Sequence, residues 1–486
     1  MSDDAGLSVM HELVYASACE LAKLIRTKQV SSEEVVRQTL ARIHEINPRL
    51  NAVVQLSAEA LEQARQADRE LGRGTLRGPL HGVPVTTKET WSTTGMVWSG
   101  GTLGRAKLEA QQDATVVSRM RAAGAISLGQ TNVPELALAY ETDNLVYGRT
   151  HNPYDVTRTP GGSGGGGAAA IASGGSALEI GADTAGSIRL PSHFCGIAGI
   201  RPTTGRVPLT GYFPPLVGIL SSISAAGPMA RRIEDLQLAL SIVSGPDGHD
   251  PETVLAPIGD PASVDVTTLR IAFYTDNGIV SSTPETVGTV QAAALAASKA
   301  GARVEEARPP GTEHSLQMFL GLFAGDGGAG VQALLEMSNS SSFHPLMEQL
   351  LQFAQKQMVS VQNFTYLLAQ RDILRRTLLD FASAYDAIIS PVCAVPAVPH
   401  GTSFHENTIP AFSYSTIYSL SGWPAAVVRC GTSPEGLPIG VQIAARPWRE
   451  DIALAVASYL ESSLGGWRMP PLDVRTASPG QSADST

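Results

Sequence analysis

The chain has 486 residues, of which 43% are hydrophobic and 16% are charged, a composition typical of a globular protein with ample apolar material for a core. Its formal net charge is −10, and no basic stripe interrupts the acidic character. Because phosphate backbones repel an acidic surface, the composition argues against a nucleic-acid partner.

The cysteines and the N-terminus indicate the compartment in which the protein works. The four cysteines lie far apart and form no C-x-x-C pair, so we expect reduced, buried thiols and neither a disulfide framework nor a metal centre; they are Cys19, Cys195, Cys393 and Cys430. No apolar signal-peptide core follows Met1, and no apolar run reaches the ~18 residues that a membrane span needs. We therefore expect a cytoplasmic protein without a membrane anchor, metal or cofactor.

The first part of the chain, residues 1–75, has a helical pattern. Ser31 and Glu34 form a capping-box signal, the apolar residues that follow recur at helical spacing, and Asn47-Pro48 is expected to end this helix. A second helix is predicted over 60–71, where apolar residues again recur on one face. We expect this segment to pack on the core as a helical addition.

From about residue 79 onward, short β-prone runs alternate with helical runs. A β-prone run over 81–87 ends at Lys88, a helix is predicted over 114–123, and a strand over 125–129 follows. The same alternation returns later; it comprises a strand at 269–273, a helix at 287–300 and a strand at 303–305. This spacing indicates an α/β layer structure.

The region from about 313 to 385 differs, because it is long, helical and without strand signals. Strands are predicted again at 386–391, and 425–430 and 438–444 are expected to pair across a turn. We therefore divide the chain into a main domain over 76–470 and a loose tail over 471–486.

A glycine cluster at 159–167, Thr-Pro-Gly-Gly-Ser-Gly-Gly-Gly-Gly, is the most informative part of the sequence, and several interpretations compete. Residues 162–167 match the dinucleotide-binding pattern G-x-G-x-x-G, with Asp183 about twenty residues further on. However, the polar run 152–155 precedes the cluster, where that pattern requires an apolar strand.

Residues 161–165 also match the nucleophile elbow G-x-S-x-G, which requires a preceding strand as well. No downstream histidine occupies the late position, after an aspartate, that such a triad needs; the candidates are His193, His249, His314, His344, His400 and His405. A flexible glycine loop without chemistry is the third interpretation, although so many glycines in a folded protein usually indicate close backbone approach.

The fourth interpretation combines this cluster with two other segments. Residues 181–191 form a second turn of small residues that contains Ser187, and Lys88 ends an otherwise uncharged β-prone run. Burial disfavours an ammonium ion, so a buried lysine can serve as a base.

Together these segments resemble the amidase signature family over nearly the whole chain. The matching segments are 82–88, 128–135, 149–155, 159–206 and 437–442. The resemblance implies an α/β fold in which helices cover both faces of a large, mixed, twisted β-sheet. It is nearest to the bacterial aryl-acylamidase, nylon-oligomer and urethane-hydrolysing branches.

The resemblance implies a Ser–cisSer–Lys triad, with Ser187 as the nucleophile, Ser163 as the bridging serine on a cis peptide, and Lys88 as the base. A neutral lysine would take the nucleophile's proton through Ser163 and return it to the leaving amine, leaving an acyl-enzyme for water to hydrolyse. The implied oxyanion hole consists of the backbone N–H groups of Thr184, Ala185, Gly186 and Ser187. Supporting roles fall to Asp183, Arg189, Gly162 and Gly164.

This sequence departs from the common family pattern in three places. Gly164 stands where a second serine is usual, Ala185 stands where a glycine is usual, and Glu89-Thr90 follows the lysine where Asp-Asn is commoner. All three triad positions are present, so we predict an active but divergent enzyme.

The helical region is expected to shape the substrate pocket. Its candidate lining residues are Met318, Phe319, Leu320, Phe323, Phe353 and Tyr366, each of which is otherwise a helix-core residue; Trp91, Trp98, Tyr140 and Trp423 are candidate aromatic walls. The prediction is a hydrolase of aryl or apolar amides, with carbamates and esters also accessible. The alternatives are an amidotransferase-type subunit or a non-catalytic protein of this fold that acts with partners, and a homodimer stays open.

Overall fold

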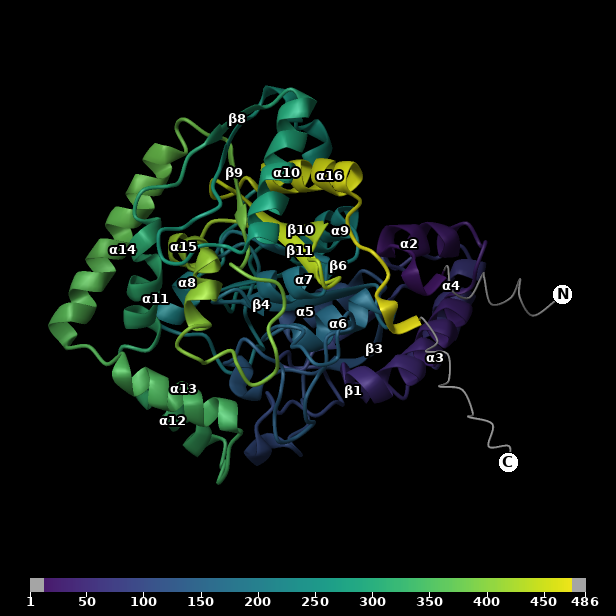
Figure 1. The fold of residues 1–486 in the computed structure, drawn as a ribbon. Coiled ribbons are helices and arrows are strands. Elements are labelled where there is room, and N and C mark those ends of the chain that lie inside the picture. Colours follow the sequence, from purple (N-terminus) through teal and green to yellow (C-terminus); the bar gives the residue numbers. More distant parts are fainter. Residues whose placement is uncertain (1–12, 474–486) are drawn as a thin grey trace, which may run out of the picture.

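The computed structural model describes residues 13–473 and has an eleven-stranded mixed sheet at its centre (Figure 1). The strand order is β1-β3-β2-β4-β6-β5-β10-β11-β9-β7-β8. The strands are β1 (Val53–Leu56), β2 (Pro84–Lys88), β3 (Ile126–Thr131), β4 (Leu178–Asp183), β5 (Ala198–Arg201), β6 (Ala225–Ala230), β7 (Arg270–Phe273), β8 (Arg303–Glu306), β9 (Ala387–Pro391), β10 (Ala425–Thr432) and β11 (Pro438–Ala445).

Parallel pairing occurs in two places: β2 is parallel to β3 and β4, and β7 is parallel to β8 and β9. The other neighbours are antiparallel, including the predicted pair β10 and β11. The predicted α/β fold with a large mixed sheet is confirmed.

Fifteen helices surround the sheet within the described residues. They are α2 (Ala18–Arg26), α3 (Ser32–Leu50), α4 (Ala60–Gly72), α5 (Thr115–Ala122), α6 (Gly165–Ala172), α7 (Arg189–Phe194), α8 (Ile219–Ile223), α9 (Ile233–Val243), α10 (Pro284–Ala300), α11 (Ser315–Phe323), α12 (Ala329–Met337), α13 (Pro345–Lys356), α14 (Val361–Phe381), α15 (Thr416–Ser421) and α16 (Glu450–Leu464). No helix between residues 13 and 473 is both long and apolar enough to cross a membrane.

Helices cover both faces of the sheet, and two consecutive residues of β10 show how. Successive side chains of a strand point to opposite faces. Val428 belongs to the apolar cluster that α9, α10 and α16 complete, whereas Val427 belongs to the cluster of α7, α11 and α15. Both sides of the central strands are therefore buried in apolar cores, which explains why these strands are almost continuously hydrophobic.

The N-terminal helices begin as predicted, but the first one ends later. Ser31 caps α3 by accepting a hydrogen bond from the N–H of Glu34. The prediction that Pro48 ends this helix is wrong, because α3 continues to Leu50 and ends at Asn51, which has φ 49°. A proline this close to the end removes a single internal N–H donor, so the last turn still forms. The strand β1, at Val53–Leu56, also joins the sheet beside β3.

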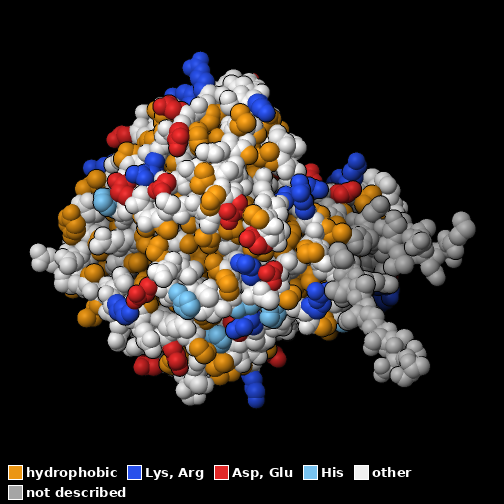
Figure 2. All heavy atoms as spheres, viewed as in Figure 1, with side chains coloured by type: hydrophobic (Ala, Val, Ile, Leu, Met, Phe, Trp, Pro, Cys, Tyr) orange, Lys and Arg blue, Asp and Glu red, His pale blue; other side chains and the backbone are white. Residues whose placement is uncertain are grey.

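The region after residue 313 forms the helices α11 to α14, which lie together on one side of the molecule, drawn in teal and green in Figure 1. Their burial differs: five of the nine residues of α11 are buried, whereas of the 21 residues of α14 only Arg371, Leu374 and Leu378 are buried. Figure 2 shows Lys and Arg side chains scattered among acidic and apolar ones on the viewed face.

The predicted loose tail lies outside the described residues from 474 onward.

Candidate active site

Lys88 is the last residue of β2, and its amino group is inside the protein. Its side chain is 0% exposed, because β3 and β4 flank β2 and α6 packs across them. The Nζ atom lies 2.8 Å from the Oγ atom of Ser163 and 3.3 Å from the hydroxyl of Tyr212. The structure thus brings together the lysine and the serine of the glycine cluster, which are 75 residues apart in the chain.

Ser163 lies at the start of α6, and the peptide bond between Gly162 and Ser163 is cis. All residues from 159 to 167 are buried, so the interpretation of this cluster as a flexible loop is wrong. A Cβ atom at Gly162 would lie 2.3 Å from the carbonyl oxygen of Ala139, and one at Gly164 would lie 2.7 Å from that of Ser187. The glycines are there because other backbone segments pass at contact distance.

The segment before the glycine cluster tests the interpretations of the cluster as a dinucleotide-binding loop or as a nucleophile elbow. The described structure has no strand between the short 3₁₀ turn at Glu135–Ala137 and α6. Both the dinucleotide-binding loop and the nucleophile elbow require a strand leading directly into the glycine turn. Ser163 therefore lacks the setting of an elbow nucleophile.

Ser187 lies in the turn between β4 and α7, and it is partly exposed. The N–H of Gly164 donates a hydrogen bond of 3.1 Å to the carbonyl oxygen of Ser187, so the two serine-bearing turns are directly joined. Ser163 and Ser187 line the same pocket. A strand followed by a tight turn and a helix places this hydroxyl at the end of the sheet.

Asp183 and Arg189 fasten the Ser187 turn. The buried carboxylate accepts hydrogen bonds from the N–H of Gly186 at 2.8 Å and from Nη2 of Arg189 at 2.9 Å. Burial alone would raise the pKa of Asp183, but the charge and hydrogen bonds of Arg189, helped by Arg201, lower it to about 2. Arg189 also donates to the carbonyl of Ser415, so the turn is anchored to the start of α15.

The four predicted oxyanion donors are not equivalent. The N–H of Gly186 is already donated to Asp183. The N–H groups of Thr184, Ala185 and Ser187 have no hydrogen-bond partner among the described residues. Thr184, Ala185 and Ser187 also line the pocket, so the residues with unpaired N–H groups and the candidate nucleophile border the same space.

Glu89, one of the departures from the family pattern, directly follows Lys88 and holds the loop at residues 99–100. It is 0% exposed and accepts hydrogen bonds from the N–H groups of Ser99 and Gly100 at 2.6 and 2.7 Å. Burial raises the pKa of Glu89 to about 7, although these hydrogen bonds counteract the effect. The residue anchors the 99–100 loop against the end of β2.

An apolar pocket of about 780 Å³, counted with its open mouth, leads to the serines. Its lining includes four of the predicted helical residues, Phe319, Leu320, Phe323 and Phe353, together with Tyr140. The predictions for Met318, Tyr366, Trp91, Trp98 and Trp423 are wrong, because none of them lines this pocket. Tyr366 is 61% exposed on α14, and Trp91 is wholly buried against Tyr212. Whether a side chain lines the pocket therefore depends on how its helix or strand is oriented in the fold, which residue type alone does not reveal.

Two parts of the site were not predicted from the sequence. One is Tyr212, whose hydroxyl contacts Lys88 and whose ring lines the pocket. The other is the wall Leu136–Ala139, where Leu136 and Ala137 have φ of 53° and 56°, a conformation that is unfavourable for residues with a Cβ. Neither part belongs to a motif, and only their position in the fold identifies them.

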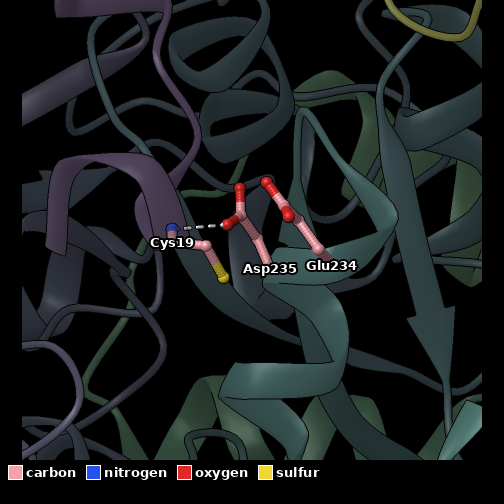
Figure 3. Close-up of side chains that lie close together, drawn as sticks. All are labelled: Cys19, Glu234 and Asp235. Carbon is pink, nitrogen blue, oxygen red and sulfur yellow. Dashed lines mark hydrogen bonds between the residues drawn. The ribbon is translucent and has the colours of Figure 1, made fainter. Parts of the chain in front are cut away.

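One group of side chains far from the pocket could be considered for a metal. Cys19, Glu234 and Asp235 lie close together where α2 meets α9 (Figure 3). The N–H of Cys19 donates to the carboxylate of Asp235 at 2.9 Å, so this carboxylate caps the start of α2. Burial and the charge of Asp235 raise the pKa of the Cys19 thiol far above its usual value, which opposes the thiolate form that binds metals.

Comparisons with known proteins identify the family of the chain. The family model described as Amidase matches residues 34–454. The chain is 34% identical to fatty-acid amide hydrolase 2-A of Danio rerio, over 95% of this chain and 91% of that protein. It is 32% identical to a glutamyl-tRNA(Gln) amidotransferase subunit of Salinispora tropica, over 95% of this chain and 100% of that protein. The solved structure of 6-aminohexanoate cyclic dimer hydrolase complexed with substrate superposes with a TM-score of 0.83 at 26% identity, covering 94% of this chain and 99% of that one.

Proposed function

The chain belongs to the amidase family of amide-hydrolysing enzymes, and on this premise we propose that it cleaves the C–N bond of apolar or aryl amides through an acyl-enzyme on Ser187. The observation that carries this proposal is the buried contact of 2.8 Å between Lys88 and Ser163, at the base of a pocket that Ser187 also lines.

The proposed first step is nucleophilic attack. A serine hydroxyl must lose its proton to attack an amide carbon, and the proton of Ser187 moves to Ser163 while the proton of Ser163 moves to Lys88. For this transfer, neutral Lys88 accepts a hydrogen bond from the hydroxyl of Ser163, whereas a protonated Lys88 would donate one to it. The Oγ–C bond forms, and the carbonyl oxygen becomes an oxyanion.

The oxyanion is stabilised by the free N–H groups of the Ser187 turn, for which we propose Thr184, Ala185 and Ser187. In this proposal Gly186 has a different role, because its N–H holds the carboxylate of Asp183. The relay then returns the proton to the leaving amine, the C–N bond breaks, and water hydrolyses the acyl-enzyme by the same route.

The pocket supports an apolar substrate. Its walls are mainly leucine, phenylalanine and alanine side chains, and no lysine, arginine, aspartate or glutamate of the described chain is among its lining residues. A charged substrate would lose its hydration there without gaining an ionic partner. Carbamates and esters present the same carbonyl to the same serine, so we include them in the proposed range.

The similarity to an amidotransferase subunit favours one second candidate, in which the chain acts with partner proteins. The purified chain alone separates the two proposals. We expect it to hydrolyse members of a panel of anilides, aliphatic amides and carbamates without any added protein, and activity that requires a partner would support the second candidate.

The assignment of the nucleophile is tested by covalent labelling. A fluorophosphonate should label the wild-type protein at Ser187, and Ser187→Ala should lose both the label and the hydrolysis while keeping its melting temperature. Ser163→Ala is the matched comparison: it should slow labelling while leaving the labelled residue unchanged. Persistent labelling of Ser187→Ala would overturn the assignment.

A further inference from the structure

A second ionisable side chain, Glu179 of β4, is buried on the same face of the sheet as Lys88. Thr86 of β2 lies opposite Glu179 in the parallel register, and Thr86 and Lys88 are two residues apart in the strand. Residues at this spacing point to the same face. Glu179 and Lys88 are both 0% exposed.

The hydrogen bonds of Glu179 come from the two strands beside it. The hydroxyls of Thr86 and Thr131 each donate to Oε2 at 2.8 Å, and Thr131 is the residue that pairs with Lys88 in β3. The other carboxyl oxygen, Oε1, has no hydrogen-bond partner among the described residues. Such a buried, half-satisfied carboxyl costs stability, so a structural role alone accounts poorly for it.

The helix above the sheet leaves room for this carboxyl. A Cβ atom at Gly167 of α6 would lie 2.0 Å from Oε1 of Glu179. The third residue of α6 is therefore required to be glycine while Glu179 is present. Since Ser163 precedes the same helix, Lys88, Ser163 and Glu179 occupy one layer between the sheet and α6, which we call the catalytic layer.

Lys88 is the ionisable partner of Glu179 in this layer. Burial raises the pKa of Glu179 to about 7, while the two threonine hydroxyls and the charge of Lys88 act in the opposite direction. Other charged groups near the layer have partners of their own: Arg231, which follows β6, donates to the carbonyls of Ile171 and Ser176, Glu89 accepts from the N–H groups of Ser99 and Gly100, and Asp183 is paired with Arg189. The helix α6 itself consists of glycine, alanine and isoleucine, and β6 places Met229 opposite Glu179. The Tyr212 hydroxyl, which contacts Lys88, is a further titratable group facing the layer.

We propose that Glu179 is a positioning residue whose carboxylate balances the positive charge that Lys88 acquires during each acyl-transfer step. The inference depends on the proposed function of Lys88. When the proton of Ser187 passes through Ser163 to Nζ of Lys88, an ammonium ion forms in a buried site, where an opposite charge stabilises it strongly. When the leaving amine takes the proton back, the lysine is neutral again and the charge of the layer is restored.

The test is the pH dependence of kcat/KM in Glu179→Gln, measured with an anilide substrate. Glutamine keeps the shape and accepts the same threonine hydrogen bonds but carries no charge. We expect the plateau of kcat/KM to fall about tenfold and the acid limb to move to lower pH by about one unit, because an ammonium ion without its counter-charge loses its proton more readily.

Glu461→Gln is the matched control. Glu461 of α16 is another largely buried carboxyl whose pKa burial raises to about 7, and it accepts hydrogen bonds from the N–H of Ile233, outside the catalytic layer. This variant should keep the wild-type pH profile.

An acid limb of Glu179→Gln that coincides with that of the wild type would overturn the role of Glu179, as would an equal shift in Glu461→Gln. In either case, a hydrolysing and labelled wild type would leave the proposed function standing. A wild type that neither hydrolyses the panel nor reacts with a fluorophosphonate would overturn the proposed function and this inference with it.

Discussion

The catalytic layer and the helical region α11 to α14 are packed in opposite ways, although Ser163 of the layer and residues of α11 and α13 line the same pocket. All five residues of β2 and all eight of α6 are buried, and a single added Cβ in the glycine cluster would collide with backbone, with Thr142 or with Glu179. In α12 only Leu335 is buried, and α14 exposes large apolar residues such as Val361 and Ile373.

This difference separates chemistry from selectivity. Proton transfer requires donor and acceptor at hydrogen-bond distance, which close packing enforces in the catalytic layer. The substrate's apolar part needs only contact area, which loosely packed helices can supply in many shapes. Substitutions in the layer should therefore affect every substrate equally, whereas substitutions on α11 and α13 should discriminate between substrates.

The largest effect is expected for Lys88→Met, which removes the base and keeps the volume. We expect kcat to fall by about 10³-fold for every amide tested, because both attack and departure lose their proton route. Steady-state rates on short and long acyl anilides measure this. A loss below tenfold, or one confined to some substrates, would contradict the assignment of Lys88 as the base.

Asp183→Asn should destabilise the protein by about 3–5 kcal/mol, because it leaves Arg189 buried without its counter-charge. The folded-state pKa of Asp183, about 2, is below its ordinary value of 3.8, so its contribution is present above about pH 4 and is lost as pH falls toward 2. Urea unfolding measured from pH 7 down to pH 3 should show the wild type losing part of this advantage over the variant. Asp155→Asn, at a more exposed ion pair, is the control and should change stability by less than about 1 kcal/mol.

Gly164→Ser restores the residue that is usual in the family, yet we expect it to reduce activity in this chain. The new Cβ would lie 2.7 Å from the carbonyl oxygen of Ser187 and 3.1 Å from the Met229 methyl group. Displacing the Ser187 turn should lower kcat by about ten- to a hundredfold, with a smaller change in KM. Unchanged kcat would show that the turn relaxes without moving the nucleophile.

The smallest and most selective effect is expected for Phe323→Ala, on the pocket wall of α11. For a decanoyl anilide, kcat/KM should fall about tenfold, since about 1.4 kcal/mol of apolar contact is lost, while an acetyl anilide should be unaffected. Tyr366→Ala, on the exposed side of α14, should change neither substrate. Equal losses for both substrates in Phe323→Ala would contradict the separation of chemistry from selectivity.

The sequence by itself determined the elements whose signals are local. Periodicity and capping predicted the start of the helix at Ser32, although not its end at Leu50, and the helix over 60–71; the alternation of strands and helices predicted the α/β class. The resemblance to the amidase signature family implied Lys88, Ser163 and Ser187 as one site, and the structure brings Lys88 and Ser163 into contact and places both serines on one pocket.

Tertiary structure alone decided what depends on contacts between distant segments. Tyr212 reaches Lys88 from 124 residues away, hydroxyls of two neighbouring strands hold Glu179 on the same face of the sheet as Lys88, and Tyr366 is exposed outside the pocket although its helix belongs to the same region. No local pattern encodes such contacts, because strand register and helix orientation are set only when the whole core packs. The glycine cluster depends on both: its sequence predicts that other segments approach closely there, and only the fold shows which atoms approach each glycine.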